Sequence, residues 1–304
     1  MTGTGGRRPA GRVALTVAAV IALVALCTGA CGPSDDTQGA GERAAGSPPA
    51  AVLAGLRAAE RATEQARSAR VESTTRIGST ISLTAGGALG WTDDRVTGTL
   101  TLTYTGGDLA DSMRQLGSAS MEARYLPDAY YARMGDAFAA QAGGRHWVRY
   151  AYDDLDDLAG GSGAELGDQI RAATPDRSLD LLLASDDVRE VGAERVRGRL
   201  TTHYSGTVQD ADAGVTGQTV EVWTDDRDLL VKKVERATTS DGELTQTAYY
   251  RDYGVRVSAR KPPADDTRDV TELLDGTGGT GGTGGTGGTS GAAETEGEST
   301  PPLG

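Results

Sequence analysis

The chain has 304 residues, with 43 acidic and 30 basic side chains and a formal net charge of −13 at pH 7. This excess of carboxylates repels phosphate backbones and anionic headgroups, so nucleic acid is excluded as an expected partner. Only two cysteines and two histidines are present, which excludes a disulfide framework and a cysteine-based metal centre; we expect no cofactor.

The first thirty residues are typical of a secretory signal peptide. Three arginines precede an apolar run at 13–26, which is too short to cross a bilayer because a spanning helix needs about 20 residues. The segment Thr-Gly-Ala before Cys31 resembles the end of a bacterial lipoprotein signal, although threonine stands where an aliphatic residue is usual. We predict a leader at 1–30, acylation of Cys31 (for example with palmitate) and an anchor on the extracytoplasmic face of the cell membrane. The alternatives are an ordinary signal peptide and an uncleaved signal anchor.

Low-complexity sequence marks both ends of the remaining chain. Removing the leader leaves 27 basic and 43 acidic residues, a net charge of −16. Residues 31–49 are rich in Gly, Ser, Pro, Ala and charge, and residues 276–304 hold a Gly-Gly-Thr repeat and an acidic end. Neither segment can bury enough apolar surface to offset its ordering entropy. We therefore predict a flexible tether, one domain at 50–275, and a disordered tail.

A helix is predicted at the start of the domain, followed by strands. Val52, Leu56, Ala59 and Thr63 recur at helical spacing after two prolines. The period then changes to two, and in residues 96–104 apolar side chains alternate with threonines. This alternation predicts a strand with one dry and one wet face.

The same alternation recurs along most of the domain. We expect Leu200, Tyr204 and Val208 to share a dry face, and Leu229 and Val231 to begin a strand that returns towards Arg236. One-sided strands joined by short polar turns predict an antiparallel sheet. The remaining alternating stretches are 121–125, 130–134, 147–152, 220–223 and one with Tyr249 and Tyr250 that ends near Val257.

The apolar face of this sheet needs a cover, which the first helix and the segment 153–185 can supply. That segment contains a possible helix at 165–173 and a second helix after Thr174 and Pro175, with leucines at helical spacing. The predicted fold class is α+β: one large curved antiparallel sheet, or half-barrel, covered on its concave face by a few helices. We expect a cavity between the two layers.

Several runs in the second half of the domain carry a family resemblance. They are Thr174-Pro175 to Leu183, Asp187-Val188 through Val191-Gly192, Thr202-His203-Tyr204-Ser205-Gly206-Thr207, Val222-Trp223-Thr224-Asp225 and Leu230-Val231-Lys232-Lys233. Together with the helix-then-sheet order, they resemble the actinobacterial LppX/LprG lipoproteins, which share the LolA/LolB half-barrel fold. The resemblance implies that acylated lipids are held between sheet and helices and moved through the envelope.

No residue pattern indicates catalysis or a metal. His146 and His203 have no second ligand at metal spacing, and no nucleophile elbow, P-loop or zincin helix is present in the sequence. The acidic run at 153–157 partly fits a calcium loop, but Leu158 and Ala159 stand where an oxygen ligand and a turn glycine are needed. We favour the interpretation that this run is the solvated start of a helix over a calcium loop, because carboxylates stabilise helix N-termini.

Aromatic and apolar residues on the dry faces are the candidates for a ligand pocket. A tyrosine offers an apolar ring to the pocket and a hydroxyl to a headgroup, although ordinary core packing explains the same residues. The candidate ligand-binding residues are Tyr125, Tyr130, Tyr150, Leu182, Tyr204 and Val222, with Trp147 and Trp223 as further aromatic positions.

The sequence thus predicts a non-enzymatic, membrane-anchored envelope lipoprotein whose partner is a lipid or another acyl-chain ligand. The alternative is a protein-binding envelope sensor or surface interaction module on the same fold, because fold does not settle function. In that case the partner is another envelope protein.

Overall fold

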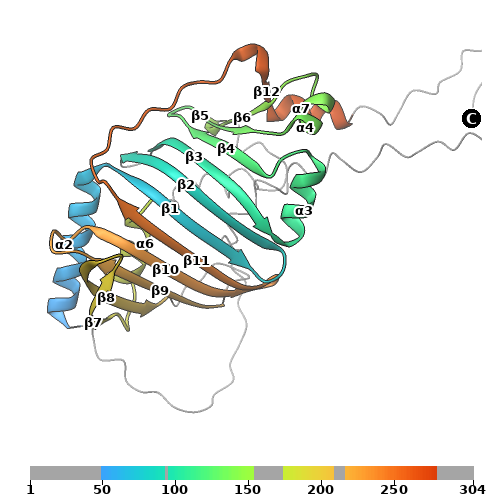
Figure 1. The fold of residues 1–304 in the computed structure, drawn as a ribbon. Helices are drawn as coiled ribbons and strands as arrows, with labels where there is room; N and C mark the ends of the chain where they lie inside the picture. The colour runs from blue at the N-terminus through green and yellow to red at the C-terminus, as the bar shows by residue number, and fades with distance from the viewer. Residues whose placement is uncertain (1–48, 93–94, 154–173, 209–215, 279–304) are drawn as a thin grey trace, which may run out of the picture.

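The computed structural model describes residues 49–92, 95–153, 174–208 and 216–278. The predicted leader, Cys31, the tether, the acidic run beyond Asp153, the possible helix at 165–173 and the tail beyond residue 278 lie outside these ranges. The described residues form one twelve-stranded sheet with a few helices against it (Figure 1). The predicted fold class is therefore confirmed.

The sheet is curved and does not close into a barrel. Its strand order is β12-β6-β5-β4-β3-β2-β1-β11-β10-β9-β8-β7, so β12 and β7 form the two edges. Neighbouring strands are antiparallel except β12 and β6, which pair in parallel. The strands are β1 (Ser68–Ile77), β2 (Ile81–Thr92), β3 (Arg95–Gly106), β4 (Ser120–Tyr125), β5 (Ala129–Arg133), β6 (Trp147–Ala151), β7 (Arg189–Val196), β8 (Arg199–Thr207), β9 (Thr216–Thr224), β10 (Leu230–Thr239), β11 (Gly242–Arg251) and β12 (Thr267–Asp269).

Five α-helices accompany the sheet in the described ranges. They are α2 (Ala50–Ala66), α3 (Gly107–Gln115), α4 (Asp136–Gln141), α6 (Asp176–Leu183) and α7 (Val270–Gly278). The predicted apolar stripe of α2 is buried, and α2 packs on α6. The helix α7 runs across the boundary that the sequence predicts between residues 275 and 276.

The two faces of the sheet differ in chemistry. We call inner the face whose side chains share one large core with α2, α3 and α6; in β3 it carries Leu100, Leu102 and Tyr104. The opposite, outer face carries the threonines of β3. It also holds two small apolar clusters, one around Trp223 and Val234 and one around Tyr131 and Trp147.

Three details of the predicted strands are wrong. Leu200 is 59% exposed, because it lies beside the hairpin turn where only the edge strand β7 flanks it. Val231 lies in the outer cluster, since a bulge between Leu230 and Lys232 shifts the alternation and turns Leu230 inward. The strand with Tyr250 ends at Arg251 and not near Val257, because Asp252 has a left-handed backbone, with φ of 53°.

The segment after β11 runs along the rim of the sheet to the edge that β12 forms (Figure 1). Ser68 Oγ donates a hydrogen bond to the Val255 carbonyl at 2.7 Å, and Arg124 Nη1 donates one to the Arg260 carbonyl at 2.9 Å. Beyond these contacts, β12 pairs with β6. The C-terminal segment therefore ties together strands that are distant in the sheet.

Glycine makes the close approach of β2 and β3 possible. Gly98 has φ of 139°, and a Cβ built on it would lie 2.3 Å from the carbonyl oxygen of Ala88. Gly86 on β2 has no such restriction, because the nearest atom to its built Cβ is the Val71 carbonyl oxygen at 4.0 Å. Of these two glycines, only Gly98 is required by the backbone.

Replacing these two glycines by alanine gives a matched test of this constraint. Gly98→Ala is expected to lower the free energy of unfolding by about 1–3 kcal/mol, because a side chain is strained there. Gly86→Ala is expected to raise it by about 0.5–1 kcal/mol, because alanine loses less backbone entropy on folding. Urea unfolding followed by circular dichroism measures both. Equal effects of the two substitutions would contradict this account of β2 and β3.

Candidate ligand-binding site

Three of the predicted binding residues meet on the inner face. Tyr125, Tyr130 and Tyr150 lie directly opposite one another on β4, β5 and β6. Their rings form a continuous row, with centroids 5.2 Å apart for the first pair and 5.7 Å for the second. Tyr104 and Tyr152 stand close by, and we call these five residues the tyrosine cluster.

Two hydroxyls of the tyrosine cluster are buried without a hydrogen-bond partner among the described residues. They belong to Tyr150, which is 4% exposed, and to Tyr152. The Tyr104 hydroxyl makes only a weak contact with Met121 Sδ, at 3.7 Å. A buried polar group without a partner costs about 1–3 kcal/mol. These hydroxyls are therefore available to an oxygen acceptor on a ligand.

Burial keeps the tyrosine cluster neutral. It raises the pKa of Tyr104 to about 12, and burial together with the Asp128 carboxylate raises that of Tyr152 to about 12. Burial also raises the pKa of Tyr125, Tyr130 and Tyr150 above the ordinary value, and the neighbouring tyrosines add to the effect. At neutral pH every member of the cluster can donate a hydrogen bond.

The other three predicted residues form a second group in the same core. Leu182 of α6 is fully buried, and Tyr204 of β8 lies opposite Val222 of β9. The Tyr204 hydroxyl lies against Gly55 of α2, where a built Cβ would be 2.5 Å from it. The structure thus places these side chains where α2 and α6 cover the sheet, in the other half from the tyrosine row.

A buried ion pair on the inner face was not predicted. Lys233 is 2% exposed and its Nζ lies 3.0 Å from Glu235 Oε1, which also accepts a hydrogen bond from Ser178 Oγ of α6 at 2.6 Å. Burial opposes ionisation of Glu235, but Lys233 and Ser178 outweigh it and hold its pKa below the ordinary value. The only signal was the alternation itself, which puts Lys233 and Glu235 on the dry face of their strand.

The histidines are engaged in local contacts. His203 stacks on Trp223 on the outer face, with centroids 4.1 Å apart, and His146 Nδ1 lies 2.8 Å from Asp266 Oδ1. Within the described ranges, no group of three or more His, Cys, Asp or Glu side chains is arranged to hold a metal. Trp147 and Trp223 lie on the outer face, away from the tyrosine cluster. No helix in the described part of the chain is long and apolar enough to cross a membrane.

Comparison with known proteins gives extensive matches in sequence, including a Streptomyces griseus protein named "Uncharacterized 31.2 kDa protein in rplA-rplJ intergenic region", which is 46% identical over 74% of this chain and 81% of that protein. A Streptomyces coelicolor protein named "Putative lipoprotein SCO4650" is 55% identical over 291 residues, which cover 91% of this chain and 100% of that protein. No protein-family model matches the chain.

Two solved structures are similar at low sequence identity. The crystal structure of LprF from Mycobacterium bovis is 13% identical, with a TM-score of 0.44 over 71% of this chain and 99% of that one. The crystal structure of the Mycobacterium tuberculosis lipoprotein LppX is 16% identical, with a TM-score of 0.40 over 68% and 98% of the two chains.

The raised tyrosine pKa values predict alkaline instability. A phenol in the unfolded chain ionises near pH 10, whereas in the fold Tyr104 and Tyr152 ionise near pH 12. The contribution of these phenols to the free energy of unfolding should therefore be constant below pH 10 and fall as the pH rises from 10 to 12, by about 1.4 kcal/mol per pH unit for each such group. Denaturant titrations at several pH values, with phenolate absorbance recorded in parallel, measure this. Ionisation of all ten tyrosines near pH 10 with the fold intact would contradict it.

Proposed function

Because the chain belongs to the same family as the Streptomyces coelicolor lipoprotein, we propose that it is a lipid-anchored envelope protein that binds an acylated ligand and catalyses no reaction. The ligand lies between the inner face of the sheet and its helices. The tyrosine cluster binds its polar oxygens, and the surrounding core accommodates its acyl chains.

The anchor in this proposal is Cys31. Its support is the sequence: a basic start, a short apolar run and small residues directly before the cysteine. The name of the relative points the same way. Two or three acyl chains hold a protein firmly on a membrane, whereas one chain binds only marginally.

The observation that carries the ligand proposal is the pair of unpartnered hydroxyls in an apolar layer. Tyr150 and Tyr152 each present a buried donor that no described residue satisfies. An ester or other acceptor oxygen would satisfy such a donor, and acyl chains would contribute about 0.8 kcal/mol for each methylene group removed from water. Apolar side chains such as Leu100, Leu102 and Met121 surround the tyrosines in the same core.

A binding role also agrees with the position of the titratable groups. His203 lies on the outer face and His146 is held by Asp266, so neither histidine serves as a base beside the tyrosine cluster. The neutral phenols are donors, with pKa values too high for them to act as bases at neutral pH.

A protein-binding role on the same fold is the second candidate, and one observation favours it. Val191 and Leu200 of the edge hairpin β7–β8 are 53% and 59% exposed. Exposed apolar side chains at the edge of a sheet are a suitable contact for another protein. In this role the protein needs no ligand on the inner face.

Native mass spectrometry after incubation with a lipid extract distinguishes the two roles. The full chain carrying Cys31→Ser is produced in a streptomycete host and released from mild detergent. We expect it to carry about one acyl lipid per chain. Tyr150→Phe should weaken that binding about fivefold through the loss of one hydrogen bond, with folding unimpaired. Tyr249→Phe is the matched control, because Tyr249 contributes to the outer cluster. A ligand-free mass, or equal binding by both variants, would reject the proposed site.

Substitution of the two cysteines tests the anchor. Cys31→Ser should abolish metabolic labelling by a palmitate analogue and release the chain from washed membranes, because the acyl chains are its only predicted attachment. Cys27→Ser should leave labelling and membrane association unchanged, since Cys27 lies within the predicted leader. Labelling that persists in Cys31→Ser would overturn the assignment of the anchor.

A further inference from the structure

A groove of about 440 Å³ crosses the outer face over β1, β2 and β3. It lies on the face opposite the tyrosine cluster and has a different lining. Four threonines and two charged residues define it, and we call it the threonine groove: Glu72, Thr74, Thr84, Thr101, Thr103 and Arg197. Its volume lies within the range of about 300–1,000 Å³ that is usual for small-molecule sites.

The strand register sets the hydroxyls of the groove side by side. Thr74 pairs with Thr84, and Thr84 pairs with Thr103, so three hydroxyls follow one another across neighbouring strands about 4.8 Å apart. Thr101 lies one step along β3, opposite Gly86. None of the four threonine hydroxyls bonds to another described side chain, and Gly86 leaves the floor of the groove open.

One wall of the groove comes from the hairpin β7–β8, at the edge of the sheet that β7 forms. Arg197 lies in the turn between β7 and β8, and the hairpin reaches over the outer face so that Val196 packs in the cluster of Trp223 and Val234. The Arg197 guanidinium then lies 3.8 Å from the ring centroid of Tyr249, and its Nη1 donates to Glu72 Oε2 at 2.8 Å. The wall is therefore fixed by packing, by a cation–π contact and by an ion pair.

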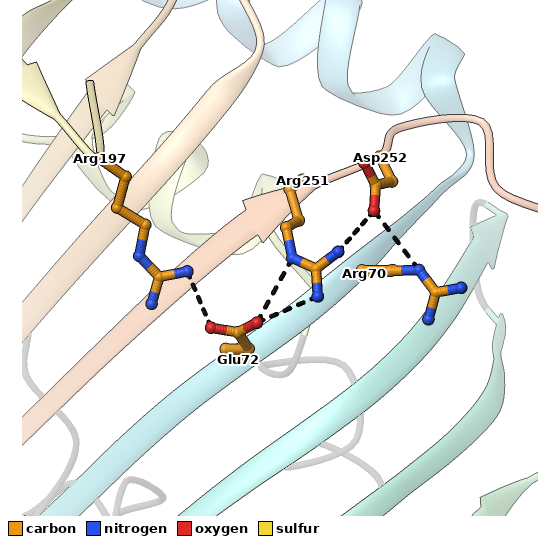
Figure 2. Close-up of polar contacts among 5 residues, drawn as sticks. All are labelled: Arg70, Glu72, Arg197, Arg251 and Asp252. Carbon is orange, nitrogen blue, oxygen red and sulfur yellow. Dashed lines mark hydrogen bonds and ion pairs between the residues drawn. The ribbon is translucent and has the colours of Figure 1, made fainter. Parts of the chain in front are cut away.

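A chain of ion pairs holds Glu72 in place (Figure 2). Arg251 Nη2 lies 3.1 Å from Glu72 Oε1, and Arg251 Nη1 donates to Asp252 Oδ2 at 2.6 Å. Arg70 Nε lies 3.4 Å from the same Asp252 oxygen. The two arginines beside Glu72 hold its pKa below the ordinary value, so the carboxylate stays ionised at neutral pH. Three arginines and two carboxylates leave this network a net charge of +1.

This lining selects one class of ligand by its chemistry. A long acyl chain needs aliphatic walls, which hydroxyls and charges do not supply. A polyanion needs unbalanced cations, whereas Arg197 and Arg251 already face Glu72. An uncharged polyol fits, because sugar hydroxyls both donate and accept hydrogen bonds, as the threonine hydroxyls do.

We propose that the threonine groove binds a neutral, polyhydroxylated chain, namely a glycan of the cell envelope. The hydroxyls of Thr74, Thr84, Thr101 and Thr103 contact the sugar hydroxyls, and the Glu72–Arg197 pair forms the wall. This site is independent of the acyl ligand, because it lies on the other face of the sheet.

Cosedimentation with cell-wall sacculi tests the groove. The full-length protein in detergent is mixed with streptomycete sacculi that have been stripped of protein and lipid, and bound protein is measured at 50 and 500 mM NaCl. We expect saturable binding that changes less than twofold with salt, because the ligand is uncharged. Binding should also occur to chitin, a neutral polymer of N-acetylglucosamine that carries no peptide.

Threonine variants supply the matched comparison. Thr101→Val with Thr103→Val keeps the shape and strand propensity of the side chains but removes two hydroxyls, and should weaken binding about tenfold. Gly86→Val fills the floor of the groove and should also weaken binding to the sacculi about tenfold. Thr97→Val with Thr99→Val, on the same face of β3 but outside the groove, should stay within twofold of the parent. Melting temperatures within a few degrees exclude misfolding.

Several outcomes would overturn the proposal. They are absence of binding to the sacculi, equal binding by the groove and control variants, loss of binding at high salt, and absence of binding to chitin. The last would show that the groove recognises a peptide instead of a glycan.

Discussion

The pairing of β1 with β11 is the interaction on which the rest of the structure depends. These strands come from opposite ends of the domain, yet they lie side by side in the middle of the sheet from Arg70 opposite Arg251 to Ile77 opposite Leu244. Two series of antiparallel strands, β1 to β6 and β7 to β11, are joined only there within the ladder. Because this contact spans most of the domain sequence, its loop-closure entropy makes it a slow step in folding.

Strict alternation gives the joined sheet two surfaces of different chemistry. In β3, Leu100, Leu102 and Tyr104 face the helices, while Thr101 and Thr103 face the opposite side. The inner surface accumulates tyrosines, two of whose hydroxyls lack partners among the described residues, and the outer surface accumulates hydroxyls and paired charges. A shift of one residue in register would exchange these surfaces, so the burial of the inner face also fixes the outer one.

The helices and strands that could be predicted from the sequence are those in which the alternation or helical spacing is clear. The helix α2 and strands β3 to β6 were predicted because large apolar residues recur at regular spacing. The central strands β1 and β2 were missed: β1 places Ser73 and Thr75 among its inner positions, and β2 contains Gly86 and Gly87 beside two alanines. Such small or polar residues are acceptable at the centre of a sheet because both neighbours supply hydrogen bonds, but they give no periodic signal.

The two candidate sites differ in whether the sequence predicts them, and the reason is related. The tyrosine row was predictable because its members stand on three strands that follow one another along the chain, where local alternation fixes the face. The threonine groove was not, since its wall joins Arg197 to Glu72 across 125 residues of sequence. Only the curl of the edge hairpin onto the outer face makes that contact, and no local pattern encodes it. Because the two sites share only β3 and use opposite faces, occupation of the inner face leaves the outer groove accessible. If both proposals hold, one sheet binds an acyl ligand and a glycan at the same time.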